Sequence, residues 1–139
     1  MVGLIAQSAE CFVHIEEVPG SSPGEPTNMK IVSLEKLKDE PLTHSPKIKK
    51  RVLLKKGEVP HLTSFSQATF KPGQIASEHV HEDMYEVYLV QGGTGLIKVD
   101  GKVHQLKKGD CVMTEPGENH EFINTGSEDL VLTYFGIQK

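Results

Sequence analysis

Two histidines one residue apart, with a glutamate five residues after the second, form the most chemically suggestive spacing in the chain. They are His79, His81 and Glu86 in EHVHEDMYEV (78–87). On a strand, His79 and His81 would project from one face and could touch one cation. On a helix they would point in nearly opposite directions, and Tyr85 stands where the helical zinc motif H-E-x-x-H needs its second histidine. The pair could therefore form part of a metal site only if it lies on a strand. Taken alone it is weak evidence, because most His-x-His pairs on strands are ordinary polar positions.

A second stretch, EPGENHEFIN (115–124), offers a fourth donor. Its Pro-Gly turn delivers His120 onto an expected strand, and the Glu-Asp pair at 82–83 can turn the chain so that Glu86 returns beside the histidines. Three imidazoles and a carboxylate suit a borderline divalent ion such as Mn, Fe, Co, Ni, Cu or Zn. Four protein ligands on an octahedral ion would leave two positions for water, substrate or dioxygen, so the expected site is an open one.

The two stretches resemble the two sequence motifs of the cupin superfamily. GQIASEHVHEDMYEVYLVQGG (73–93) matches the first, and GDCVMTEPGENHEFIN (109–124) matches the second, except that the usual proline is replaced by Glu115 and shifted to Pro116. The resemblance covers about residues 52–138. It implies an all-β, single-domain double-stranded β-helix, a jelly-roll barrel with one divalent transition metal ion inside. It also implies the ligands, which are His79, His81, Glu86 and His120.

The pattern along the rest of the chain also favours strands. KIVSL (30–34) predicts a short strand, and SLEKLKDE (33–40) a helical turn before Pro41. About ten short, often alternating segments follow, punctuated by Gly, Pro, Asn and Asp. VDGK (99–102) predicts a two-residue type I′ hairpin. A sandwich or closed barrel is therefore expected, and the lack of crossover helices excludes a parallel α/β sheet.

The chain divides into three predicted parts. Residues 1–28 contain the Pro-, Gly- and Ser-rich EEVPGSSPGEPTN, and they resemble the peptide made when an upstream transfer-RNA gene is read as protein. We expect this leader to be disordered or spurious, with the functional protein beginning at Met29; a true flexible arm is the alternative. Residues 29–50 are predicted to form an N-terminal strand and connection, and residues 51–139 the barrel.

Composition limits the classes of partner. A chain of 139 residues has room for one domain, and its net charge of −4 leaves no basic footprint for nucleic acid. The one basic cluster, KIKKRVLLKK (47–56), alternates with apolar residues and predicts a solvated or edge strand.

No segment is apolar for long enough to span a membrane, and the start lacks a signal-peptide pattern. Two cysteines in unrelated contexts suit a reducing cytoplasm, and Cys111 is expected to be a small buried residue.

Three further residues are candidates for a substrate pocket. Tyr88 shares strand parity with Glu86, and Phe122 and Asn124 share it with His120. Tyr88 can equally be a core tyrosine, and Asn124 can hold a turn. His104 is expected at the surface or beside the ligands, while no motif surrounds His14, His44 or His61.

The resemblance implies a metal-dependent enzyme of dioxygenase, decarboxylase or isomerase type, acting on a small oxygenated organic molecule. The alternative is a non-catalytic module that binds or senses a small ligand. A metal-free sugar epimerase is disfavoured because the ligand set is complete. A homodimer is expected by resemblance, and because outer strands need their edges covered.

Overall fold

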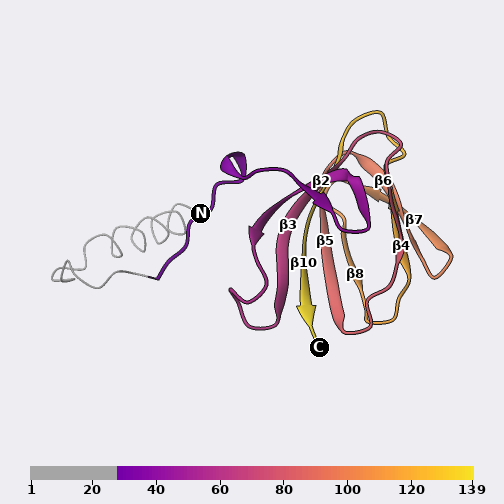
Figure 1. The fold of residues 1–139 in the computed structure, drawn as a ribbon. Coiled ribbons are helices and arrows are strands. Elements are labelled where there is room, and N and C mark those ends of the chain that lie inside the picture. The colour runs from indigo at the N-terminus through magenta and orange to yellow at the C-terminus, as the bar shows by residue number, and fades with distance from the viewer. Residues whose placement is uncertain (1–27) are drawn as a thin grey trace, which may run out of the picture. The chain divides into compact units, whose positions relative to one another are not determined.

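The computed structural model describes residues 28–139, so the predictions made for the leader lie outside the described residues, apart from Asn28. Contacts divide the chain into Met1–Ile31 and Val32–Lys139, and all described strands belong to the second unit. These strands form two antiparallel sheets, drawn as arrows in Figure 1.

The first sheet has six strands and the second has four. The first has the order β1 (Glu40–Leu42), β2 (Ser45–Leu54), β3 (Leu62–Phe70), β10 (Leu130–Gln138), β5 (Met84–Gly92) and β8 (Cys111–Thr114). The second has the order β4 (Ile75–His79), β9 (His120–Ile123), β6 (Thr94–Val99) and β7 (Lys102–Lys107). From β3 onward the chain passes repeatedly between the sheets, which confirms the predicted all-β jelly-roll architecture.

Strict alternation along the strands produces the core. In β10 the side chains of Leu130, Leu132 and Tyr134 are buried while their neighbours are less so, as expected for a strand with one face turned inward. The inward faces of both sheets supply the hydrophobic core, which consists of Ile48, Ala68, Phe70, Ala76, Tyr88, Val90, Ile97, Leu106, Phe122, Leu130, Leu132 and Tyr134.

The hairpin predicted at VDGK is confirmed. It joins β6 and β7, with Asp100 at φ 46° and Gly101 at φ 82°. Positive φ at both central residues is the type I′ conformation, whose twist matches that of the flanking strands.

Two predictions about the N-terminal part need correction. Residues 30–34 form no strand, because the outer position beside β2 is taken by β1. The expected turn is present as a 3₁₀ helix over Leu34–Lys36. β2 crosses the predicted boundary at residues 50 and 51. β1 pairs with it only as far as Lys50, so from Arg51 onward β2 is paired on one side alone.

Cys111 is exposed, so its predicted burial is wrong. It begins β8, the outer strand of the first sheet, where Val112 and Thr114 occupy the inward positions and Cys111 takes the opposite face.

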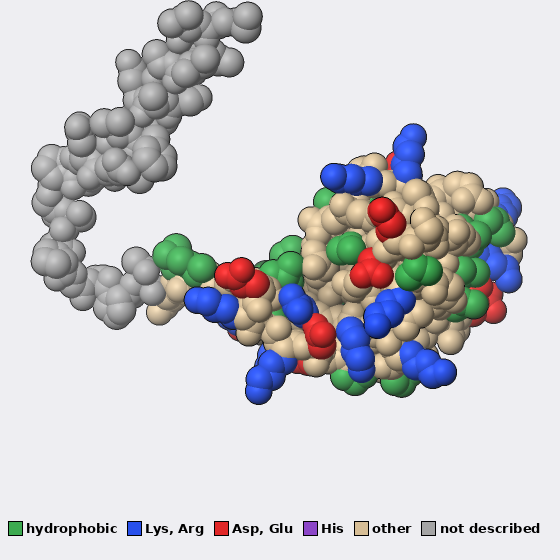
Figure 2. Space-filling model, turned by 90° about the horizontal axis from the view of Figure 1, so that it is seen from above, with side chains coloured by type: hydrophobic (Ala, Val, Ile, Leu, Met, Phe, Trp, Pro, Cys, Tyr) green, Lys and Arg blue, Asp and Glu red, His purple; other side chains and the backbone are tan. Residues whose placement is uncertain are grey.

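Charged side chains of both signs are interspersed over the face shown in Figure 2. Among the described residues, Arg51 Nε forms an ion pair with Asp39 Oδ1 at 2.8 Å. Within residues 28–139, no helix has the length and hydrophobicity needed to cross a membrane.

Candidate metal centre

His79 and His120 lie side by side on neighbouring strands of the second sheet. His79 ends β4, His120 begins β9, and the two are Cα partners in the antiparallel register. Their ring centroids are 4.4 Å apart. The two motifs, separated by some forty residues in the sequence, therefore meet through a single strand pair.

His81 reaches the same point without lying on a strand. β4 ends at His79 and β5 begins at Met84, so the strand predicted to carry both histidines is too short and His81 belongs to the connection. Its carbonyl accepts a hydrogen bond of 2.8 Å from the Gly117 N–H, in the turn that precedes His120. Gly117 has a φ of 88°, which favours glycine there. The two motifs are thus tied together by backbone as well as by strand pairing.

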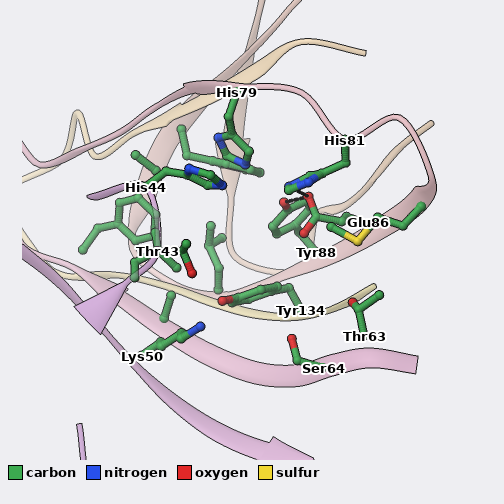
Figure 3. A pocket seen from close by; sticks show the side chains of 17 residues that line it. Thr43, His44, Lys50, Thr63, Ser64, His79, His81, Glu86, Tyr88 and Tyr134 are labelled. Atoms are coloured by element: carbon green, nitrogen blue, oxygen red, sulfur yellow. Dashed lines mark hydrogen bonds and ion pairs between the residues drawn. The ribbon is translucent and has the colours of Figure 1, made fainter. Parts of the chain in front are cut away.

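Glu86 completes the cluster from β5, where it is buried. Its Oε2 lies 3.5 Å from His81 Nε2 and 3.2 Å from His120 Nε2. One possible ligand atom from each of His79, His81, Glu86 and His120 lies within 4.8 Å of all the others. Figure 3 shows His79, His81 and Glu86 directed toward a common point.

This spacing fits a mononuclear site. Bonds from transition metals such as zinc to imidazole nitrogen or carboxylate oxygen are about 2.0–2.2 Å, so donors on opposite sides of an ion lie roughly 4.0–4.4 Å apart. The observed cluster would need only a small inward adjustment. The donor set suits transition metals such as Mn, Fe, Co, Ni, Cu or Zn better than the all-oxygen sites of calcium.

Two backbone carbonyls orient the histidine rings. His79 Nδ1 lies 2.7 Å from the Ser77 oxygen, and His120 Nδ1 lies 3.1 Å from the Glu118 oxygen. Because a carbonyl only accepts, Nδ1 must carry the hydrogen in both rings, which leaves Nε2 as the nitrogen that can bind a metal ion when it is deprotonated. This is the arrangement by which proteins fix the tautomer of metal-binding histidines.

The electrostatics of the cluster favour neutral His79 and His81 and an ionised Glu86, but a protonated His120, whose proton a metal ion would have to displace. Burial, with smaller contributions from the neighbouring imidazoles, lowers the pKa of His79 and His81 and so favours their neutral forms. Burial would raise the pKa of Glu86, but hydrogen bonds from His120 and Tyr88 outweigh it and leave that pKa lowered. Burial would likewise lower the pKa of His120, and its bonds to Glu86 and the Glu118 carbonyl raise it instead.

Tyr88 supports the carboxylate from inside the core. Its hydroxyl donates to Glu86 Oε2 at 2.6 Å and lies 3.3 Å from His120 Nε2. Burial, reinforced by the Glu86 carboxylate, holds the pKa of Tyr88 well above its usual range, so the hydroxyl keeps its proton. Tyr88 therefore both packs in the core and touches the candidate ligands.

A cavity of about 230 Å³ opens beside the cluster. Tyr88 and Phe122 lie on its wall. Asn124 has a different place: its Nδ2 donates to the carbonyls of Phe70 and Glu128, each at 2.8 Å, and its Oδ1 accepts from the Gly126 N–H at 2.9 Å. Both Nδ2 hydrogens are used at the end of β9, and Asn124 is not among the residues that line the cavity, so the structure gives it the turn-holding role.

His44 is a residue that sequence reasoning missed. It lies in the turn between β1 and β2 and lines the cavity, with its ring stacked on that of His79 at a centroid distance of 4.8 Å. Ser45 anchors this turn, since its Oγ accepts the Ser77 N–H at 2.9 Å. No spacing in the sequence connects residue 44 to the cluster, because the contact depends on how the hairpin folds over β4. His104, in contrast, is exposed on β7.

Comparisons with known proteins found a matching family model and several related sequences. A family model described as "Cupin domain" matches residues 66–136. An oxalate-binding protein from Thermotoga maritima is 36% identical over 66 residues, covering 48% of this chain and 54% of that protein. A gentisate 1,2-dioxygenase from Aquipseudomonas alcaligenes is 30% identical over 60 residues, which cover 43% of this chain and 17% of that enzyme. The match thus spans about half the length of the first relative and much less of the second.

Solved structures share the whole barrel. A crystal structure from Thermotoga maritima, described as a predicted oxalate decarboxylase, superposes with a TM-score of 0.74 at 26% identity, covering 79% of this chain and 100% of that one. A cupin-superfamily sugar phosphate isomerase from Silicibacter pomeroyi superposes with a TM-score of 0.68 at 18% identity, over 79% of this chain and 76% of its own. The second likeness concerns the fold alone. Together these matches confirm the predicted double-stranded β-helix.

Proposed function

This chain belongs to the cupin family, and on that premise we propose that it binds one divalent transition metal ion and, through it, a small oxygenated organic acid. The ligands would be His79, His81, Glu86 and His120. The observation that carries the proposal is the convergence of these four donors, three of which, His79, His81 and Glu86, line a cavity. A buried carboxylate beside three imidazoles is costly unless a charge pairs with it, and a cation at their centre would pair with it.

The chain's own residues would prepare the site for this ligand. The carbonyls of Ser77 and Glu118 accept from Nδ1 of two imidazoles and so direct their Nε2 atoms toward the cluster, and Tyr88 holds the Glu86 carboxylate while keeping its own proton. When bound, the ion would supply Lewis acidity, polarising substrate oxygens and stabilising negative charge that develops on them. The apolar wall beside it, including Phe122, would exclude water and strengthen these interactions.

We propose catalysis of decarboxylase, dioxygenase or isomerase type as the use of this site. The names of the relatives support this class, since they include a predicted oxalate decarboxylase and a gentisate dioxygenase. The alternative is a binding protein that releases its ligand unchanged, and the oxalate-binding protein of Thermotoga maritima supports it. A homodimer in the cytoplasm remains an expectation; light scattering in solution would test the dimer.

Titration calorimetry and a turnover assay test the proposal together. Oxalate should bind the metal-loaded full chain, and binding should be lost in metal-free protein and in His120→Ala. Consumption of the acid would identify an enzyme, while binding without turnover of oxalate, phenolic acids or sugar phosphates would identify the binding module. Oxalate binding that is equally strong with and without metal would contradict the proposal.

A further inference from the structure

One lysine occupies an unusual position on the inner side of the barrel. In β2, Ile48 belongs to the hydrophobic core, and Lys50, two residues later, shares its face. Lys50 is half-buried and lines the cavity. Lysine is rarely found facing inward unless a partner compensates its charge.

No such partner is present among residues 28–139. The ion pairs found there join Arg51 with Asp39, and Glu86 with two histidines; none includes Lys50. Glu40 is the Cα partner of Lys50 in the β1–β2 hairpin, yet it forms no ion pair with it. The ammonium group of Lys50 is therefore a charge without a protein partner at the wall of a cavity.

Lys50 and the candidate metal ligands stand at opposite sides of this cavity. Figure 3 shows the amine of Lys50 pointing inward from the wall across from His79 and His81. The hydroxyl-bearing residues Thr43, Ser64 and Tyr134 also line the cavity. Burial raises the pKa of Tyr134 to about 12, so its hydroxyl remains a donor at neutral pH. Apolar side chains, among them Ala68, Phe70 and Leu132, make up much of the remaining lining.

The two sides would both be positively charged, and they come from different parts of the chain. One carboxylate, Glu86, would neutralise only half the charge of a divalent ion, so a loaded metal end keeps a net positive charge. Lys50 adds a second positive charge across an apolar middle. Lys50 lies outside the matched family region, residues 66–136, whereas all four candidate ligands lie within it.

We propose that Lys50 binds a second acidic group of the ligand, so that the cavity selects small dicarboxylic acids with a short apolar spacer. This inference rests on the proposed function, because one carboxylate would be held at the metal end. The other carboxylate would accept hydrogen bonds from the ammonium group and from the neighbouring hydroxyls. A cavity of about 230 Å³ is smaller than the roughly 300–1,000 Å³ typical of sites for drug-sized ligands, which limits the acid to a few carbons.

Matched pairs of acids test the inference by calorimetry on the metal-loaded full chain. Each pair replaces one carboxylate by a methyl group: malonate with propionate, succinate with butyrate, and glutarate with pentanoate. At least one dicarboxylate should bind about tenfold or more tightly than its partner, since a hydrogen bond to a charged group is worth that much. Lys50→Met, which keeps the length of the side chain without its charge, should abolish this preference and leave monocarboxylate binding unchanged.

Lys49→Met is the matched control, because Lys49 is exposed on the opposite face of the same strand. It should retain the preference. Thermal melting of both variants checks that the barrel is intact. The inference would be overturned if Lys50→Met weakened the binding of both acids of a pair equally, or if the unchanged protein did not prefer any dicarboxylate over its matched monocarboxylate. Either result would leave the proposed metal site unaffected. A chain that binds neither metal nor acid would overturn the proposed function and the inference with it.

Discussion

The two walls of the cavity are built in different ways. The wall with the candidate ligands combines β4, β5, β9 and their connections. Three of its four donors are held by a further contact: His79 by the Ser77 carbonyl, His120 by the Glu118 carbonyl and Glu86 by the Tyr88 hydroxyl. The second wall includes the β1–β2 hairpin, where Lys50 has no ion-pair partner within residues 28–139 and the exposed His44 reaches over to stack on His79. The donors of the first wall would hold an ion in one geometry. The charge of Lys50 in the second wall has no protein partner and would be available to a bound ligand.

Removing a donor from the first wall should have the largest effect. In His79→Ala or His120→Ala we expect the metal content, measured by elemental analysis after gel filtration, to fall from about one ion per chain to near zero, because three donors remain of four. His104→Ala, at an exposed position on β7, is the control and should retain the metal. A full metal content in either ligand variant would mean that the ion is held elsewhere.

Tyr88→Phe should have a smaller effect on the same wall. The change removes the hydroxyl that donates to Glu86 Oε2 while leaving the ring in the core. Loss of a group that orients a metal ligand should weaken metal affinity about tenfold to hundredfold, as measured by competition with a chelator. Tyr85→Phe, whose side chain is 38% exposed on the other face of β5, should leave the affinity unchanged. An equal effect of both variants would contradict the assigned role.

Local sequence patterns predicted part of the fold, and two sequence motifs predicted the candidate ligands of the first wall. The Asp-Gly turn of the β6–β7 hairpin and the alternation of β10 follow from propensity and period. The resemblance to the cupin motifs implied the cluster of His79, His81, Glu86 and His120, which the structure brings together, although the strand expected to carry both His79 and His81 ends before His81. A hydrogen bond from Gly117, which no strand pattern encodes, brings His81 into place.

The second wall could not be predicted, because it depends on tertiary pairing. Nothing near His44 or Lys50 in the sequence indicates that a hairpin folds over β4 and turns them toward a cavity. The same limit explains the strand wrongly expected at 30–34: its pattern suits a strand, but β1 takes the place beside β2. It also explains Cys111, whose apolar neighbours hid the fact that β8 is an outer strand.

Ser45→Ala should affect the second wall and leave the first unchanged. It removes the oxygen that accepts the Ser77 N–H and so loosens the hairpin, at a cost of about 1 kcal/mol in the free energy of unfolding measured with urea. The metal content should stay at its normal value. Ser127→Ala, at an exposed loop position, should change the unfolding free energy by less than about 0.5 kcal/mol. Loss of metal in Ser45→Ala would show that the hairpin belongs to the metal site.

The smallest effect is expected for His44→Ala. Although its ring stacks on His79, the residue is exposed and lies outside the cluster of four donors. Metal content should be unchanged, and the free energy of unfolding should shift by no more than about 0.5 kcal/mol. If elemental analysis showed that the ion is lost, His44 would have to be counted as a fifth ligand.

The central claim is that these four side chains bind one ion, and an anomalous difference map tests it most directly. Crystals of the metal-loaded protein, measured at the absorption edge of the bound metal, should show one peak about 2.0–2.2 Å from a nitrogen of His79, His81 and His120 and an oxygen of Glu86. A peak at another place, or no peak at the cluster in protein that contains stoichiometric metal, would contradict the claim.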